Sequence, residues 1–181
     1  MIYVIEHGQT ALDAKGESHG GRDTPLDAKG RRQALGLGVR MLASEPKPLV
    51  IFHSPKRRAE QTARLAGRVA GIAATPAPAL APLRSGTLGA GPESQVARRL
   101  APYFASPRRR IPGGESVAVW RGRHLGFMRR LAAAGVPAAA VTHSNVIGSL
   151  QGGPRGAIKA LAEPPQPAQV ALEIEFRHRQ Q

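Results

Sequence analysis

The sequence predicts an α/β fold, a three-layer α/β/α sandwich with a largely parallel central sheet. Short apolar runs typical of buried strands occur at residues 3–5, 49–52 and 138–141. Between them lie longer segments with apolar side chains at helical spacing, and the sequence contains no internal repeat. Strands that alternate with helices form a parallel sheet with helices on both faces. We expect residues 1–181 to form a single domain.

The first half of the chain is expected to supply three strands and two helices. After the strand at residues 3–5, a stretch rich in Gly, Asp, Ser and His over 11–25 predicts a loop. Residues 28–42 then form a helix, in which Ala34, Leu35, Val39 and Leu42 lie at helical spacing. The strand at 49–52 follows, then a second helix over 55–69 and a weak strand within 72–77.

The start of the second helix carries a specific signal. Ser54 is a favourable N-cap residue, and Pro55 suits the first helical position. We therefore expect the helix to begin at Pro55.

The second half of the chain is expected to continue the alternation. Residues 78–92 are irregular because they are rich in Pro and Gly. The remaining predicted elements are helices at 93–104 and 115–134, a strand at 138–141, a helix at 145–151 and, after a Gly/Pro-rich segment, an edge strand within 169–177.

The composition excludes several classes of protein. The chain has no cysteine, so it offers no disulfide, thiol nucleophile or thiolate metal site. It has no apolar run of 18 residues and no basic segment followed by a long apolar one, so we expect no membrane association and a cytoplasmic location. The 26 Lys and Arg against 12 Asp and Glu give a net charge of +14, which favours anionic partners. Aromatic residues make up only 4%, which disfavours a base-stacking surface.

Three predicted strands end in residues suited to phosphoryl chemistry. His7 follows the first strand, Arg58 lies shortly after the second, and His143 follows the strand at 138–141. The carboxyl ends of parallel strands share one edge of a sheet, so these side chains are expected to converge. One imidazole can attack phosphorus, the guanidinium can bind two phosphate oxygens, and the second imidazole can bind a third. The helix starts after Ser54 and Ser144 would add N–H donors.

In addition, the chain resembles the histidine phosphatase superfamily, the phosphoglycerate mutase-like proteins. The resemblance spans about residues 2–150, its segments occur in the family's order, and 54–63 is the most specific of them. The segments are EHGQT (6–10), GRDTPL (21–26), GRRQA (30–34), SPKRRAEQTA (54–63), PGGES (112–116) and VTHSNVI (141–147).

This resemblance implies a fold, a reaction and roles for individual residues. His7 would be the nucleophile and form a phosphohistidine, while Arg58 and His143 stabilise the transferring phosphoryl group. The reaction would need no metal or organic cofactor, and the partner would be a small phosphorylated substrate or a phosphoprotein. The sequence does not distinguish a monomer from a dimer. The residues expected to contribute to substrate binding are Glu6, Gly8, Asp13 and Ser144.

Three positions depart from the family pattern. Glu6 stands where the family has an arginine, and Asp13 where it has an asparagine. Unit charges about 4 Å apart interact by roughly 4 kcal/mol at an effective dielectric constant near 20, so a carboxylate beside a phosphate is a severe change. Pro82 stands where the family usually has an acidic proton donor, and proline cannot donate a proton.

These departures leave alternatives open. Glu6 could act as an acid or base, fix the tautomer of a histidine, or pair with an arginine such as Arg84. Glu93 is the nearest carboxylate after Pro82, but its position favours a solvated residue in the first turn of a helix.

For the whole protein, the sequence favours a phosphatase over a mutase. The alternative is a catalytically degenerate protein that binds an anionic ligand or partner. Nucleic-acid binding through the arginines at 108–110 is a weaker third option.

Overall fold

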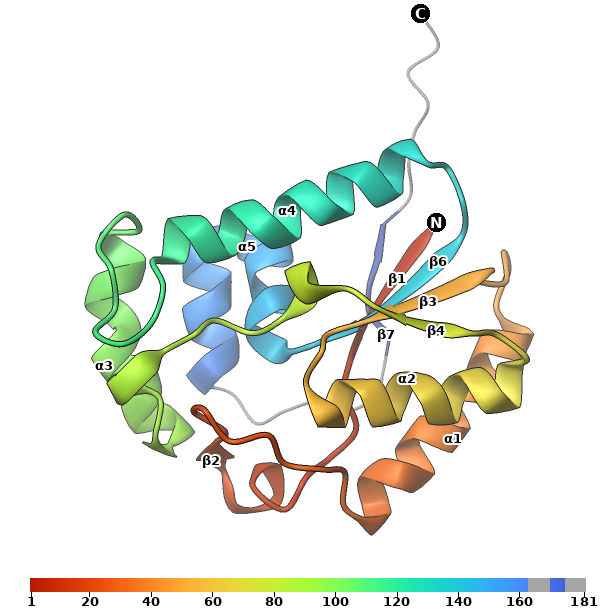
Figure 1. The fold of residues 1–181 in the computed structure, drawn as a ribbon, viewed down its shortest axis with the longest axis horizontal. Coiled ribbons are helices and arrows are strands. Elements are labelled where there is room, and N and C mark those ends of the chain that lie inside the picture. The colour runs from red at the N-terminus through yellow and green to blue at the C-terminus, as the bar shows by residue number, and fades with distance from the viewer. Residues whose placement is uncertain (163–169, 175–181) are drawn as a thin grey trace, which may run out of the picture.

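The computed structural model describes residues 1–162 and 170–174, and its centre is a five-stranded sheet (Figure 1). The strand order is β4-β3-β6-β1-β7. The first four of these strands are mutually parallel, and β7 runs antiparallel to β1 at the edge. The predicted, largely parallel sheet is therefore confirmed. The strands are β1 (Ile2–Glu6), β3 (Val50–His53), β4 (Ala74–Pro76), β6 (Ala138–Thr142) and β7 (Val170–Ile174).

Helices cover both faces of this sheet, which makes the three layers. Side chains alternate along β1, so Tyr3 and Ile5 face a core formed with α1 and α2, while Ile2 and Val4 face a core formed with α4 and α5. A third apolar cluster joins α3 to α4 and α5 beyond the end of the sheet. The helices are α1 (Ala28–Ala43), α2 (Arg57–Ala70), α3 (Glu93–Ala105), α4 (Val117–Ala133) and α5 (Ser144–Ala162).

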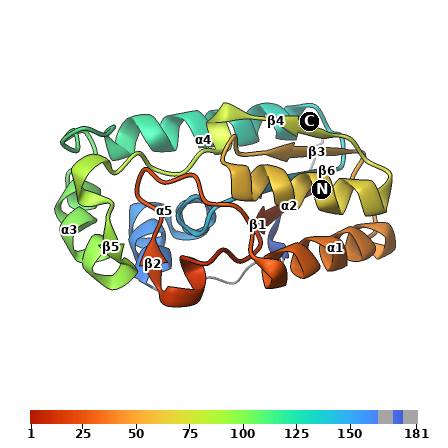
Figure 2. The ribbon, with the colours of Figure 1, turned by 60° about the horizontal axis from the view of Figure 1, so that its bottom comes forward.

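The loop predicted over residues 11–25 contains structure of its own. It holds a short 3-10 helix, η1 (Asp13–Lys15), and a two-residue strand, β2 (Glu17–Ser18). That strand pairs with β5 (Gly91–Pro92), so two segments far apart in the sequence lie side by side next to α3 (Figure 2). The irregular segment before α3 is therefore tied to the loop after β1.

Helix α1 buries a different face from the one suggested by its apolar spacing. Ala34, Leu37 and Met41 are buried, whereas Leu35, Val39 and Leu42 are 43–59% exposed. The reason is close packing: a Cβ built on Gly38 would lie 2.6 Å from the Ala66 carbonyl oxygen, so this face must contain a glycine to meet α2. Small residues, rather than the largest apolar ones, decide which side of α1 faces inward.

Two predicted helix limits are wrong. Helix α2 begins at Arg57, two residues after the predicted start at Pro55. The Ser54 hydroxyl accepts from the Lys56 N–H at 3.3 Å and from His143 at 2.8 Å. Helix α5 continues to Ala162, beyond the predicted end at 151, because it resumes after a non-helical break at Gly152 and Gly153. Within residues 1–162, none of the helices combines the length and the apolar character that crossing a membrane requires.

Candidate active site

The ends of β1, β3 and β6 bring His7, Arg58 and His143 together. His7 follows β1, Arg58 lies in the first turn of α2 after β3, and His143 follows β6. All three are buried, and the rings of His7 and His143 lie 5.1 Å apart between centroids. The convergence expected from strand order is therefore present, while the catalytic roles of these residues remain predictions.

Arg58 lies between the two histidines and bonds to both. Its Nε–H donates to Nε2 of His7 at 3.0 Å, and its Nη2 donates to Nδ1 of His143 at 3.2 Å. A guanidinium group can only donate hydrogen bonds, so each contacted ring nitrogen must carry a lone pair. This fixes the tautomer of both rings.

The His7 ring is anchored on its other side. Nδ1 lies 2.9 Å from the Gly8 carbonyl oxygen, so it carries the proton and donates it to that oxygen. Burial, followed by the charge of Arg58, lowers the pKa of His7 to about 3. At neutral pH, the ring is therefore uncharged, and its Nε2 has the lone pair that a nucleophile needs.

His143 has the opposite tautomer. Its Nε2–H donates to Oγ of Ser54 at 2.8 Å, which leaves the lone pair on Nδ1 facing Arg58. Burial and then the Arg58 charge hold the pKa of His143 well below its usual value. The sequence analysis missed the part played by Ser54, because a serine before a helix normally signals a cap.

Gly8 holds the His7 ring through its backbone. Its N–H donates to Oγ1 of Thr62, and its carbonyl accepts from His7, so both groups are used within the protein. A Cβ at Gly8 would lie 2.6 Å from the Gly30 carbonyl oxygen, and one at Gly30 would lie 2.1 Å from the Gln9 carbonyl oxygen. Only two glycines allow this approach between the end of β1 and α1. The structure thus shows a positioning role for Gly8, and its contact with substrate remains a prediction.

One part of Arg58 is left for a ligand. Its Nη1 is buried and has no hydrogen-bond acceptor in the described part of the chain. Burial lowers the pKa of Arg58 to about 10, so the group stays charged at neutral pH. A buried, charged donor without an acceptor is costly, and an anion bound beside it would satisfy it.

Carboxylates also line the cavity. Of the described residues that line it, three are carboxylates (Glu6, Asp13 and Glu93) and one is a guanidinium, that of Arg58. Glu6 is only 4% exposed and helps to keep Arg58 protonated. Arg84, considered above as a partner for Glu6, lies 4.0 Å from Glu115. The cavity is therefore less positive than one built solely for phosphate.

Asp13 is fixed by hydrogen bonds. One carboxylate oxygen accepts from the backbone N–H of Thr10 at 2.7 Å, and the other accepts from Nε2 of His19 at 3.0 Å. Burial alone would raise the pKa of Asp13, but the bond from His19 and the other favourable interactions outweigh it and lower the pKa to about 2. Asp13 is therefore ionised at neutral pH.

Glu93 lines the cavity from the first turn of α3 and is half-buried rather than solvated. Its backbone N–H donates to the Gly16 carbonyl at 3.0 Å, beside the pairing of β2 with β5. Burial and then the negative charge of Asp13 raise the pKa of Glu93 to about 7. Pro82 also lines the cavity, so a proton donor with a suitable pKa is present although the expected position holds a proline.

One further predicted residue, Ser144, lies at the same cavity, and two other lining residues, Asn145 and His19, were missed. Ser144, at the start of α5, lines it together with Asn145. His19 also lines it and was not singled out, although the sequence marked its loop as rich in polar residues. Its Nδ1 lies 2.6 Å from Oγ1 of Thr24.

These features agree with what comparison of the sequence shows. Residues 2–160 match the histidine phosphatase superfamily (branch 1), and the chain belongs to this family. The resemblance stated from the motifs is thereby confirmed.

Among curated proteins, the chain is similar to probable phosphoglycerate mutases named GpmB. It is 29% identical over 127 residues to the protein of Yersinia enterocolitica and 31% identical over 122 residues to that of Salmonella paratyphi C. Each match covers 65% of this chain and 56% of the relative, so the chain spans little more than half the length of these relatives.

Solved structures of the same fold include a mycobacterial glucosyl-3-phosphoglycerate phosphatase. It superimposes with a TM-score of 0.67 at 25% identity, and the match covers 82% of this chain and 76% of that chain. The protein TTHB049 of Thermus thermophilus gives a TM-score of 0.66 at 28% identity, covering 82% of this chain and 81% of that chain. A phosphatase or mutase type of activity is therefore plausible for this fold and family.

Proposed function

We propose that the protein is a phosphatase that hydrolyses a small phosphomonoester or a phosphohistidine through a phosphohistidine intermediate on His7. The observation that carries the proposal is the fixed tautomer of that ring. With Nδ1–H held by the Gly8 carbonyl, the lone pair of Nε2 faces the guanidinium that would bind the phosphoryl group. A neutral, oriented imidazole of this kind is prepared for attack on phosphorus.

In the first step, Nε2 of His7 attacks the phosphorus atom, and the bond from phosphorus to the leaving-group oxygen breaks. Arg58 turns from the ring to the phosphoryl oxygens, and its free Nη1–H supplies one of the new hydrogen bonds. His143 now accepts from Arg58 through Nδ1, so it donates to the phosphoryl group only after gaining a proton there. A bound dianion favours that protonation.

Glu93 is the proposed proton donor to the leaving group. Its raised pKa keeps a large share of it protonated near neutrality. In the second step, a water molecule attacks the phosphohistidine, its proton passes to the Glu93 carboxylate, and inorganic phosphate leaves His7. When the substrate is itself a phosphohistidine, the departing imidazole needs less help from an acid.

The charges of the cavity favour substrates with no anionic group beside the phosphate. Glu6 and Asp13 are both buried and face the same space as Arg58. Phosphoglycerate, which appears in the names of the relatives, carries a carboxylate that these side chains would repel. We therefore propose a phosphatase acting on a less acidic substrate, rather than a phosphoglycerate mutase.

A second candidate is a degenerate member of the family that binds an anionic ligand or partner without turnover. The buried carboxylate of Glu6, in the place of a phosphate-binding arginine, is the observation that favours it.

The two candidates differ in turnover. Hydrolysis of an aryl phosphate and of phosphohistidine is to be measured for wild type, His7→Ala and Glu6→Arg. Turnover in wild type that is lost in His7→Ala supports the phosphatase. Inactive wild type, with activity gained in Glu6→Arg, supports the degenerate pocket. Turnover that survives His7→Ala contradicts the proposed intermediate.

A further inference from the structure

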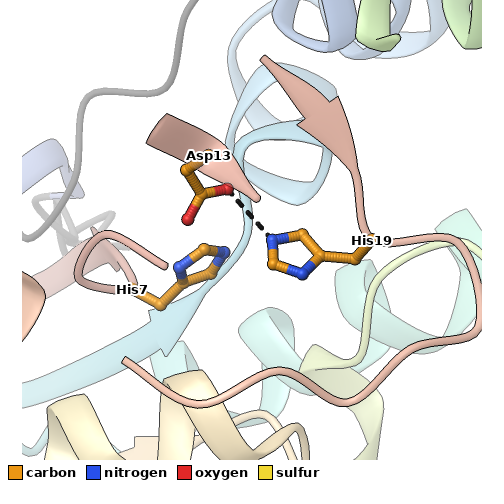
Figure 3. A group of neighbouring side chains, drawn as sticks. All are labelled: His7, Asp13 and His19. Atoms are coloured by element: carbon orange, nitrogen blue, oxygen red, sulfur yellow. Dashed lines mark hydrogen bonds and ion pairs between the residues drawn. The ribbon is translucent and has the colours of Figure 1, made fainter. Parts of the chain in front are cut away.

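His7, Asp13 and His19, three of the residues that line the cavity, form a compact group of ligand-type side chains (Figure 3). One nitrogen or oxygen atom from each lies within 4.8 Å of the corresponding atoms of the other two. The residues come from three places: the end of β1, the helix η1 and the turn after β2. The fold thus gathers two imidazoles and a carboxylate around one point.

Each member of this group is held in the way that metal ligands usually are. The second ring nitrogen of His7 donates to the Gly8 carbonyl, and that of His19 lies 2.6 Å from the Thr24 hydroxyl. The second oxygen of Asp13 accepts from the Thr10 backbone. Such outer partners orient ligating side chains toward a metal ion. The inner atoms now bond to one another or to Arg58: Nε2 of His19 donates to Asp13, and Nε2 of His7 accepts from Arg58.

The spacing suits a small cation. Zinc binds imidazole nitrogen and carboxylate oxygen at about 2.0–2.2 Å in a tetrahedron, which places neighbouring ligand atoms about 3.3–3.6 Å apart. Nε2 of His19 and Oδ1 of Asp13 already lie 3.0 Å apart, and the His7 and His19 rings meet edge to face with centroids 5.7 Å apart. Small side-chain rotations would bring the third ligand into range.

The surrounding charge also favours a cation. Glu6 and Glu93 face the same cavity as Asp13, and the one guanidinium among the described lining residues is that of Arg58. A divalent ion there would offset the carboxylates, although it must displace the Arg58 Nε–H from His7.

We infer that His7, Asp13 and His19 bind a zinc-type divalent cation, and that the bound ion switches off the phosphatase. On binding, His19 changes tautomer: it loses the Nε2 proton that now bonds to Asp13 and takes one up on Nδ1, which then donates to the Thr24 hydroxyl. The Nε2 lone pairs of His19 and His7 then bind the metal, after Arg58 has left His7. The lone pair of His7 is the proposed nucleophile, so a metal-bound His7 cannot attack phosphorus. A fourth position on the ion remains for water. The inhibition rests on the proposed function, whereas the binding of the ion does not.

Binding is tested first, without reference to activity. The chain of residues 1–181 is freed of metal with a chelator, and binding of Zn²⁺ is measured by calorimetry for wild type, His19→Gln and Asp13→Asn. Because Asp13 also holds the Thr10 backbone, circular dichroism and the melting temperature check that each variant is folded. Glu17→Gln, a partly exposed carboxylate in the same segment, is the matched control. The absorption spectrum of bound Co²⁺ reports directly on the coordination geometry.

The expected result is one Zn²⁺ per chain in wild type and in Glu17→Gln, with affinity at least about tenfold weaker in His19→Gln and Asp13→Asn. Absence of binding in wild type, or equal affinity in all four proteins, overturns the site. If binding is as expected and wild type hydrolyses an aryl phosphate, Zn²⁺ should inhibit wild type at lower concentrations than His19→Gln. Stimulation of hydrolysis by Zn²⁺ would overturn the inhibitory role while leaving the site in place. If wild type binds zinc but hydrolyses no phosphate ester, the metal site stands, and the proposed phosphatase activity and its inhibition by zinc are overturned.

Discussion

The Nε–H of Arg58 donates to Nε2 of His7 across 3.0 Å, so the resting protein protects its proposed nucleophile with the group that would bind the substrate. A phosphoryl group that enters the cavity competes for the same guanidinium, and its arrival exposes the lone pair. Ligand binding and activation of the nucleophile are thereby one event.

Arg58→Lys should lower kcat/KM for an aryl phosphate by about 10²-fold or more, since the loss of one oriented donor to a developing charge has that effect. Lysine keeps the charge but not the planar fork that reaches both histidines. Arg57→Lys, at the exposed neighbouring position, is the control and should change little. Equal losses in the two variants would argue against a special role for Arg58.

The ring of His7 should remain uncharged from pH 8 down to pH 5. Burial and the Arg58 charge hold its pKa near 3, far below the ordinary value of 6.5. The unfolded chain takes up this proton near pH 6.5, so the contribution of His7 to stability decreases as the pH falls from 6.5 toward 3. Nuclear magnetic resonance of labelled histidine checks the charge directly. In Arg58→Gln the pKa should rise, and a normal titration near pH 6.5 in wild type would contradict the buried geometry.

Glu93→Gln should stabilise the protein at pH 8. The folded pKa of about 7 exceeds the ordinary value of 4.5, so between these two pH values the folded state holds a proton that the unfolded state has lost. Stability therefore falls as the pH rises through this window and is constant above it. The gain expected from the variant is roughly 1 kcal/mol after discounting for partial exposure, and it should vanish at pH 4. Urea unfolding at both pH values, with Glu17→Gln as the reference, measures it.

The same variant should separate good leaving groups from poor ones. Without a proton donor, hydrolysis of an alkyl phosphate should fall by about 10²-fold, while an activated aryl phosphate changes far less. The wild-type rate on the alkyl ester should decrease above about pH 7, as Glu93 loses its proton, and the variant should lack that decrease. Equal losses on both substrates would assign the acid to another group.

Gly30→Ala should destabilise the fold by about 2 kcal/mol or more, because the new Cβ would meet the Gln9 carbonyl at 2.1 Å. Gly36→Ala, in the same helix, should instead stabilise it by about 0.5–1 kcal/mol. Its nearest neighbour at 3.6 Å is the flexible end of Arg40. The melting temperatures of the two variants test whether the close approach of α1 to the end of β1 is needed for stability. Similar melting temperatures for Gly30→Ala and Gly36→Ala would show that it is not.

The sequence was sufficient to predict the sheet and the convergence of His7, Arg58 and His143. Both follow from one rule, that parallel strands end at a common edge. It did not reveal His19 or Glu93 as site residues, because they reach the cavity through the pairing of β2 with β5. That pairing has only two residue pairs, and one of its residues is Pro92. Strands this short show no recognisable alternation of apolar and polar residues in the sequence.

Competition between local and tertiary interactions explains the other differences. Ser54 has the chemistry of an N-cap, and its hydroxyl accepts from the nearby Lys56 N–H, but the same oxygen also accepts from His143 and the helix begins only at Arg57. Leu35, Val39 and Leu42 have helical spacing, but α1 meets α2 through Gly38 on another side. In both cases a contact distant in sequence competes with a local preference.

The residues that line the cavity fall into two groups, according to whether the main sheet or the short pairing of β2 with β5 holds them. His7, Arg58 and His143 are carried by the main sheet and the first turn of α2, whereas His19 directly follows β2 and Glu93 directly follows β5. The Glu93 backbone also donates to the Gly16 carbonyl. Weakening that ladder would shift the proposed acid Glu93 and the candidate ligand His19 together, while His7, Arg58 and His143 stay in place. The proposed proton delivery and the proposed anion binding could therefore be changed separately, by substitutions in different elements of the same cavity.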